Sequence, residues 1–123
     1  MATVISTFNN VVGLNNSLKL ATWAPLTTTN ADGSPFEFPD WADNTVHVFG
    51  TFGVGGTVLV EGSNDGTNWA TLTDSNGTTL SLTVASVKAI NERPRYLRPR
   101  VSAGDGTTSI TAILLARRIE SIS

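Results

Sequence analysis

Residues 58–72 read VLVEGSNDGTNWATL, and this stretch decides the fold class. Alternating apolar residues lead into a polar, glycine-containing run, and the chain leaves that run through Trp69. Asn and Asp beside Gly supply the positive φ angles that tight hairpins need. Val58 and Val60 before the run, with Trp69 and Leu72 after it, have the spacing of two antiparallel strands. The stretch predicts a β-hairpin in which Trp69 caps the core and whose structural residues are Asn64, Asp65, Gly66 and Trp69.

A calcium-binding loop is the alternative for the same stretch. A loop of the EF-hand type needs oxygen ligands at alternate positions and a distant bidentate Glu. After Asp65 the chain continues as GTNW, and the next acid is Asp74. The turn interpretation is therefore preferred. With one histidine and no cysteine in the chain, neither a metal site nor a cofactor is expected.

Clusters of turn-forming residues recur along the whole chain, and helix-forming residues are sparse. Short runs between regular turn signals are typical of an all-β sandwich, and a length of 123 residues indicates one domain. We expect a single-domain β-sandwich of jelly-roll type, with an immunoglobulin-like sandwich as the alternative. Strands are expected at 3–8, 18–24, 44–52, 56–62, 68–73, 78–84, 95–102 and 108–118, and one helical turn within 82–92.

Two of the expected strands carry more specific information. Pro99 cannot donate a ladder hydrogen bond, so the strand over 95–102 is expected to lie at an edge or to change partner there. The strand over 108–118 is apolar on both faces. That pattern predicts a central strand, or one whose second face is covered by another chain.

Residues 1–16 are expected to form an N-terminal arm and residues 17–123 the sandwich, with a long loop at 25–44. Long loops in small domains either contact partners or fold back and bury their own aromatic residues, and both remain open here. The aromatic residues of this loop are Phe36, Phe38 and Trp41. The arm is a candidate for adding a strand to a neighbouring protein through Val4, Ile5 and Phe8.

Charge is distributed unevenly along the chain. Before residue 88 one base stands against seven acids (1 − 7 = −6), and from Lys88 onward seven bases stand against three acids (7 − 3 = +4). These charges are either solvated, or they pair between neighbouring copies of an oligomer. Nucleic acid is not an expected partner, because the basic set is small and the net charge is −2. No membrane association or signal peptide is expected, since no long apolar run occurs.

No catalytic site is expected, and the protein is predicted not to be an enzyme. His47 lies within a strand pattern, and no nearby motif supplies a nucleophile or an orienting acid. Asp40 and Asp43 flank Trp41 and have the residue types of a glycosidase pair, but turn preference explains them as well.

Two segments resemble a family of known proteins. GTFGVGGTVLVEGSNDGTNWATL (50–72) and RYLRPRVSAGDGTTSITAILLARR (95–118) are similar to small structural proteins of tailed bacteriophages, and in particular to capsid decoration, or cement, proteins. The resemblance implies an accessory protein, made in the host bacterial cytoplasm, that binds the major capsid protein on the exterior of the virion and stabilises the shell. The GS-DG-NW hairpin also occurs in other jelly-roll modules, so a carbohydrate-binding module and a neck or tail component remain alternatives.

For a decoration protein we expect partner contacts through apolar and aromatic side chains ringed by arginines, because interfaces concentrate binding energy in such residues. The candidates are Val4, Ile5, Phe8, Trp23, Phe36, Phe38, Trp41, Arg98, Arg100, Arg117 and Arg118. A homo-oligomer, for which a trimer is the expectation, would gain avidity on a repeated lattice.

Overall fold

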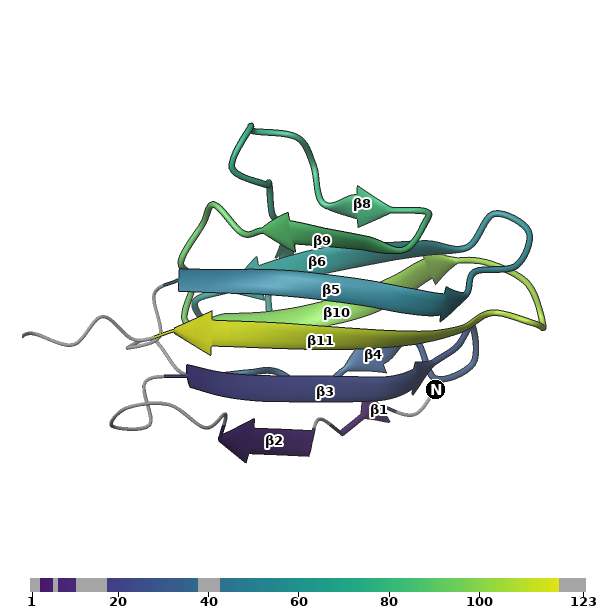
Figure 1. Cartoon of the computed structure of the whole chain (residues 1–123), viewed down its shortest axis with the longest axis horizontal. Helices are drawn as coiled ribbons and strands as arrows, with labels where there is room; N and C mark the ends of the chain where they lie inside the picture. Colours follow the sequence, from purple (N-terminus) through teal and green to yellow (C-terminus); the bar gives the residue numbers. More distant parts are fainter. Residues whose placement is uncertain (1–2, 6, 11–17, 38–42, 118–123) are drawn as a thin grey trace, which may run out of the picture.

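The computed structural model describes residues 3–5, 7–10, 18–37 and 43–117, and every regular element in these ranges is a β-strand. The strands form two sheets packed face to face, as Figure 1 shows with one sheet in front of the other. The all-β sandwich expected from the sequence is confirmed. No helix in the described part of the chain is long and apolar enough to span a membrane.

The first sheet, sheet A, has the strand order β1-β4-β10-β6-β7, and β8 also pairs with β6. Its long pair joins β6 and β10, which run antiparallel with Glu61 opposite Arg98. Short strands complete the sheet on both sides of this pair. The bounds are β1 Thr3–Val4, β4 Asp32–Gly33, β6 Thr57–Ser63, β7 Ala70–Thr71, β8 Ser81–Leu82 and β10 Tyr96–Ala103.

The second sheet, sheet B, has the strand order β2-β3-β11-β5-β9. Its central strand is β11, as the apolar pattern of 108–118 predicted, and β11 pairs antiparallel with both β3 and β5. The bounds are β2 Thr7–Asn10, β3 Leu18–Leu26, β5 Asp43–Thr51, β9 Ser86–Ala89 and β11 Ser109–Arg117.

The connections identify the topology. From β3 onward the chain crosses to the other sheet after each strand, except between β6, β7 and β8, which stay in sheet A. The resulting orders, β3-β11-β5-β9 and β4-β10-β6-β7, are those of a jelly roll built from two Greek keys. The strand order that the sequence left open is therefore that of the jelly roll.

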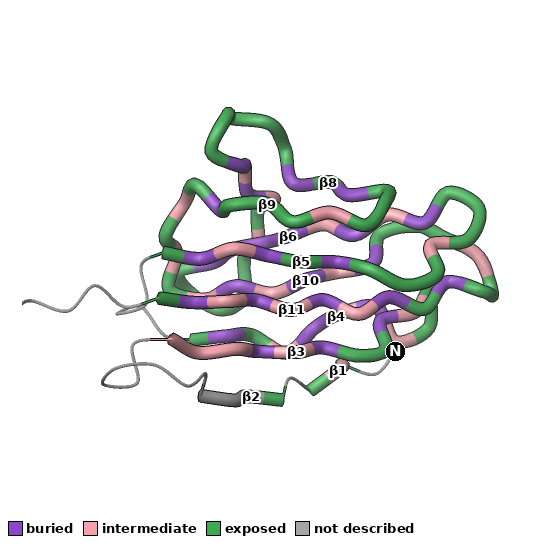
Figure 2. Tube along the Cα trace, in the orientation of Figure 1, coloured by how far each residue is buried: buried purple, intermediate pink, exposed green. Residues whose placement is uncertain are grey.

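The core lies between the sheets and is built from alternate residues of each strand, as the buried and less buried segments along β11 and β5 show in Figure 2. The largest fully buried side chains are Trp23, Phe36, Leu26, Leu80, Ile110, Val48 and Val58. The indole N–H of Trp23 donates to the carbonyl oxygen of Ser34 over 2.9 Å, which satisfies the polar atom of this buried ring.

Pro99 lies inside sheet A and marks a change of partner, one of the two outcomes expected for it. On one side β10 pairs with β6 along its length. On the other side Leu97 bridges to Phe36, and Arg100 pairs with Asp32 of β4. Between them the proline ring packs against Gly33, where an added Cβ would come within 2.6 Å of the ring.

Three features of the secondary structure differ from the sequence expectations. The long loop expected at 25–44 contains the strand β4, Asp32–Gly33, which pairs with β1 and β10. The helical turn expected within 82–92 is wrong, because Ser86–Ala89 form the edge strand β9, which pairs with β5. The described residues of the N-terminal arm belong to the chain's own sheets: β1 pairs with β4, and β2 pairs with β3. The described residues of the arm therefore form the outermost strands of the two sheets rather than a separate extension.

Candidate functional site

A ladder of charged side chains lies on the outer face of sheet A. Glu61 of β6 is buried, and its two carboxylate oxygens each accept a hydrogen bond of 3.0 Å from the Nε of an arginine of β10, Arg98 and Arg100. Because side chains alternate along a strand, these arginines point away from the core that Leu97 and Val101 help to form. We call Glu61, Arg98 and Arg100 the arginine ladder.

Trp69 extends the arginine ladder. The guanidinium carbon of Arg98 lies 4.2 Å from the centroid of the Trp69 ring, which is a cation–π contact. Trp69 is only half-buried. The expectation that it caps the core is therefore wrong: it comes after the hairpin turn and covers an arginine on the outside of the sheet.

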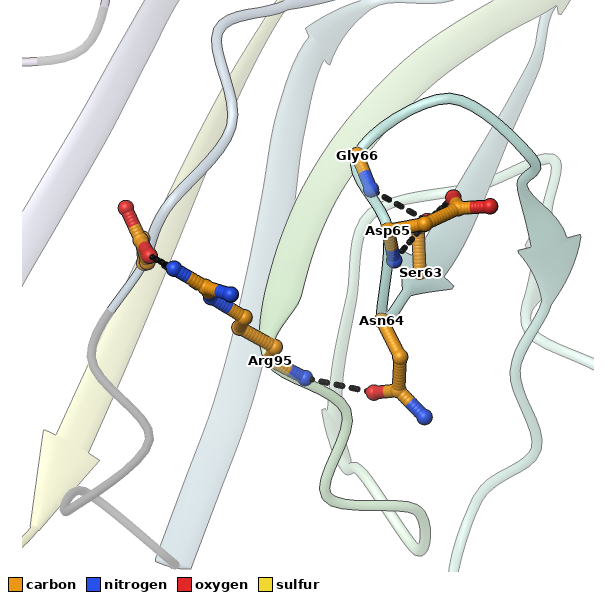
Figure 3. A network of polar contacts seen from close by, with 6 residues as sticks. Ser63, Asn64, Asp65, Gly66 and Arg95 are labelled. Carbon is orange, nitrogen blue, oxygen red and sulfur yellow. Dashed lines mark hydrogen bonds and ion pairs between the residues drawn. The ribbon is translucent and has the colours of Figure 1, made fainter.

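The turn before Trp69 is the predicted hairpin, and its polar side chains satisfy one another (Figure 3). Asp65 accepts hydrogen bonds from the backbone N–H groups of Thr67 and Asn68 and from the Asn68 side chain, and the Ser63 hydroxyl donates to it over 2.8 Å. The bond from the Asn68 N–H, ahead of the others, holds the pKa of Asp65 far below its ordinary value. Gly66 has a φ of 77°, which glycine adopts without strain.

The same turn is tied to the start of β10. The side-chain oxygen of Asn64 accepts a hydrogen bond of 2.9 Å from the backbone N–H of Arg95, as the dashed line in Figure 3 shows. Arg95 lies over the ring of Tyr96, with 5.1 Å between the guanidinium carbon and the ring centroid, and its Nη2 lies 2.6 Å from a carboxylate oxygen of Glu37. The bond to Glu37 raises the pKa of Arg95. At the start of β10, these contacts hold the guanidinium group of Arg95 and the ring of Tyr96 in position.

Part of the uneven charge of the sequence is paired within the chain. Each ion pair found among the described residues joins a base from the C-terminal part to an acid from the N-terminal part. The pairs are Arg95–Glu37, Arg98–Glu61, Arg100–Glu61 and Arg117–Asp43. Acidic and basic parts of the sequence therefore meet within one chain at these four pairs.

Two more carboxylates fix loops around the sandwich. Asp105 accepts hydrogen bonds from the Thr107 hydroxyl and from the backbone N–H of Val54, which joins the β10–β11 loop to the β5–β6 loop. The bond from Thr107 is the main cause that lowers the pKa of Asp105 to about 2. Glu92 accepts from the hydroxyl and the N–H of Thr73, and the hydroxyl bond lowers its pKa.

The structure corrects two of the proposed contact residues and leaves others undecided. Trp23 and Phe36 are 1% and 2% exposed, so they belong to the core and cannot contact a partner. The burial of Trp23 also removes it as a platform for a sugar ring. Val4 packs against the core, whereas Ile5 is 74% exposed. Phe38, Trp41, Arg118 and the side chain of Phe8 lie outside what the structure describes.

Of the proposed arginines, Arg98 and Arg100 come together on one face, whereas Arg117 lies on the other sheet and pairs with Asp43. Sequence reasoning missed Glu61, Tyr96 and Trp69 as members of this surface. One available signal was the alternation of RYLRPR, which places Tyr96 on the same face as the arginines.

No group of three or more His, Asp or Glu side chains in the described ranges is placed to hold a metal ion. His47 is exposed, and its ring centroid lies 5.0 Å from that of Phe49. An open depression of about 410 Å³ lies beside the hairpin turn. Its lining is mostly polar and contains no aromatic residue: Gly62, Ser63, Asn64, Asn68, Leu72, Glu92, Arg93 and Pro94.

The arginine ladder is suited to binding acceptor groups. Two guanidinium groups carry ten N–H donors, and the bonds to Glu61 use the Nε donor of each, while Asp32 of β4 stands opposite Arg100 in the register. Such donors suit the carboxylates or carbonyl oxygens of a partner. Glu61 holds the arginines in position before binding, which reduces the entropy lost on binding. No protein-family model matches the sequence, and a comparison with curated proteins finds no match.

Proposed function

We propose that the chain is a bacteriophage head decoration protein that binds the major capsid protein on the outside of the assembled shell and stabilises it. One observation supports this proposal above the others. The segments that resemble decoration proteins, 50–72 and 95–118, contribute the neighbouring strands β6 and β10, and these two strands build the arginine ladder. The similarity therefore includes both strands of the candidate surface, together with β11 of sheet B.

The composition of this surface fits a protein partner. Protein interfaces concentrate binding energy in Trp, Tyr and Arg, and sheet A presents Trp69, Tyr96, Arg98 and Arg100 on its outer face. The arginines are partly shielded, with side chains 19% and 34% exposed. Partly desolvated guanidinium groups bind acceptors more strongly than fully hydrated ones, since the local dielectric constant is lower.

Stabilisation of the shell follows from mass action. A protein that binds only assembled coat subunits shifts the equilibrium toward the assembled state by an amount that grows with its concentration relative to Kd. The fold suits this passive task, because its loops are fixed by internal hydrogen bonds such as those of Asp65 and Asp105.

The experiment that tests this function is co-sedimentation of the purified protein with empty capsids of its phage at micromolar concentration. Arg100→Gln removes one cation from the arginine ladder and is expected to weaken binding about tenfold or more. Lys88→Gln removes one cation from β9 of the other sheet and serves as the matched control, with unchanged binding expected. Circular dichroism and thermal unfolding establish that both variants are folded.

Two results would contradict the proposal. One is wild-type protein that stays in the supernatant at every capsid concentration. The other is an equal loss of binding for both variants, which would place the capsid contact elsewhere. Binding of a soluble glycan by wild-type protein, in the absence of capsid binding, would instead favour the carbohydrate-binding alternative.

A further inference from the structure

The outer face of sheet B has a different character from that of sheet A. Cross-strand register groups its residues into rows. The middle row runs Thr7–Thr22–Ile113–His47–Val87, the next runs Leu20–Leu115–Thr45–Ala89, and Thr111 pairs with Phe49. We call these rows the neutral face.

The neutral face carries no Asp, Glu, Lys or Arg at any of its described positions. The charged pair Asp43–Arg117 stands at one end of it, beyond the Thr45 row, and its members neutralise each other. The charged residues Lys19 and Lys88 stand at register positions of the opposite face, opposite Ala116 and Val46. Uncharged surface of this extent is what two sheets bury when they pack on each other.

Apolar side chains are concentrated at the centre and on one side of the neutral face. Ile113 and Leu115 of the central strand are half-buried, although they point away from the core. Val87 is 62% exposed and Phe49 36% exposed. The solvent-facing side of an antiparallel sheet is normally polar. Here many of the outward positions are apolar, namely Leu20, Phe49, Val87, Ala89, Ile113 and Leu115.

We propose that the neutral face is a self-association surface, on which a second copy of the chain packs its own neutral face around a two-fold axis. The argument for a second copy is that the face complements itself. A two-fold rotation places neutral rows over neutral rows and brings no charge into the contact. Each Asp43–Arg117 pair then lies at the rim, where water remains.

The available area fits a two-fold contact. The five strands of sheet B lie about 4.8 Å apart and average about seven residues of about 3.4 Å each, so the whole outer face of the sheet covers about 570 Å² per copy, or about 1,140 Å² for both. A specific interface needs about 1,000 Å² or more in total. The neutral face with the Asp43–Arg117 end at its rim is therefore large enough for a dimer.

The proposal is independent of the decoration function and is tested without capsids. Sedimentation velocity of the full chain between about 1 and about 100 μM should show a reversible dimer, within the affinity range of an interface of this size. Val87→Lys places a charge on the neutral face, and dimerisation should weaken about tenfold or more because each charge must be desolvated. Val84→Lys is the matched control, since Val84 is 65% exposed but lies before β9.

Both variants change an exposed side chain, so both are expected to fold. The proposal is overturned if wild-type protein is monomeric over the whole range, if it forms a closed trimer, or if Val87→Lys and Val84→Lys dimerise equally. As a second readout, hydroxyl-radical labelling of Phe49 should decrease as wild-type concentration rises, whereas labelling of Tyr96 on sheet A should not change.

Discussion

The outer faces of the two sheets are both formed by the outward side chains of paired strands, but they differ in chemistry. On sheet A the buried carboxylate of Glu61 is held between two arginines, and an aromatic ring covers one of them. On sheet B the corresponding rows carry aliphatic and hydroxyl side chains with His47 among them. Alternation along the strands provides both faces, so the difference comes only from which residues occupy the outward positions. Sheet A is suited to a partner with acceptor groups, and sheet B to a neutral surface.

The two faces should differ most in how much unfolding free energy is lost when a carboxylate is replaced by an amide. Glu61→Gln leaves two partly buried arginines without their counter-charge, and unfolding in urea should show a loss of about 2–3 kcal/mol. Asp43→Asn makes the same chemical change at the end of sheet B. Its ion pair with Arg117 is exposed, so the loss should be at most about 0.5 kcal/mol. Equal losses would mean that Glu61 is not the structural centre of its face.

Salt should separate the two binding modes. Raising ionic strength from about 0.05 to about 0.5 M screens charge pairs, so capsid binding through the arginine ladder should weaken by about tenfold. Association through the neutral face should be unchanged or slightly stronger, because it buries no charge. Co-sedimentation and sedimentation velocity in the same buffers measure both. Parallel weakening of the two would show that sheet B also binds through charge.

Acid should destabilise the fold through carboxylates outside the neutral face. Asp65, Glu92 and Asp105 have lowered pKa values, that of Asp105 being about 2. A carboxyl whose folded pKa lies below its unfolded value stabilises the fold above the unfolded pKa, and this contribution is lost as pH falls through the folded pKa. The urea concentration at which half of the protein is unfolded should therefore decrease as the pH is lowered from about 4 to about 2.

Asp105→Asn isolates one part of that acid sensitivity. The asparagine side chain does not titrate, so the urea midpoint of the variant should depend less steeply on pH over the same interval. Ser109→Ala, close by on β11, removes no charge and should keep the wild-type slope. An unchanged slope in Asp105→Asn would show that the bonds from Thr107 and Val54 do not stabilise the ionised form.

The smallest expected effect is the coupling of Trp69 to Arg98. A double-mutant cycle with Trp69→Leu and Arg98→Met should give about 0.5–1 kcal/mol from urea unfolding, the range of partly exposed cation–π contacts. The same cycle for capsid binding tells whether the pair acts as one unit toward the partner. A coupling energy near zero in both measurements would mean that the ring only covers the guanidinium.

Much of the fold could be predicted from local patterns. The hairpin at 58–72 and the central position of β11 follow from turn chemistry and alternation, and both are found. The edge strand β9 was missed, because its four residues, three exposed and one half-buried, lack an apolar period. The burial of Phe36, within 25–44, could not be predicted, because it depends on a backbone bridge to Leu97, which is distant in the sequence.

The candidate site was predicted only in part, for a related reason. The arginines of RYLRPR could be assigned to one face from alternation alone. Their partner Glu61 lies 37 and 39 positions earlier, and nothing local reveals the register that brings it opposite Arg98. Trp69 was assigned to the core because large aromatic residues are usually buried, and only the Arg98 contact explains its position outside.

The strands β1 and β2 close one side of the sandwich, one in each sheet, as Figure 1 shows beside β4 and β3. An open edge offers unpaired backbone groups to any identical molecule, and a chain with two open edges on one side can grow into a fibre. β1 and β2 are edge strands themselves, but they are only two and four residues long, and short edge strands offer few unpaired backbone groups to an identical molecule. Removing them would leave the nine-residue strand β3 as an edge, so association edge to edge should increase when the protein is crowded on a surface.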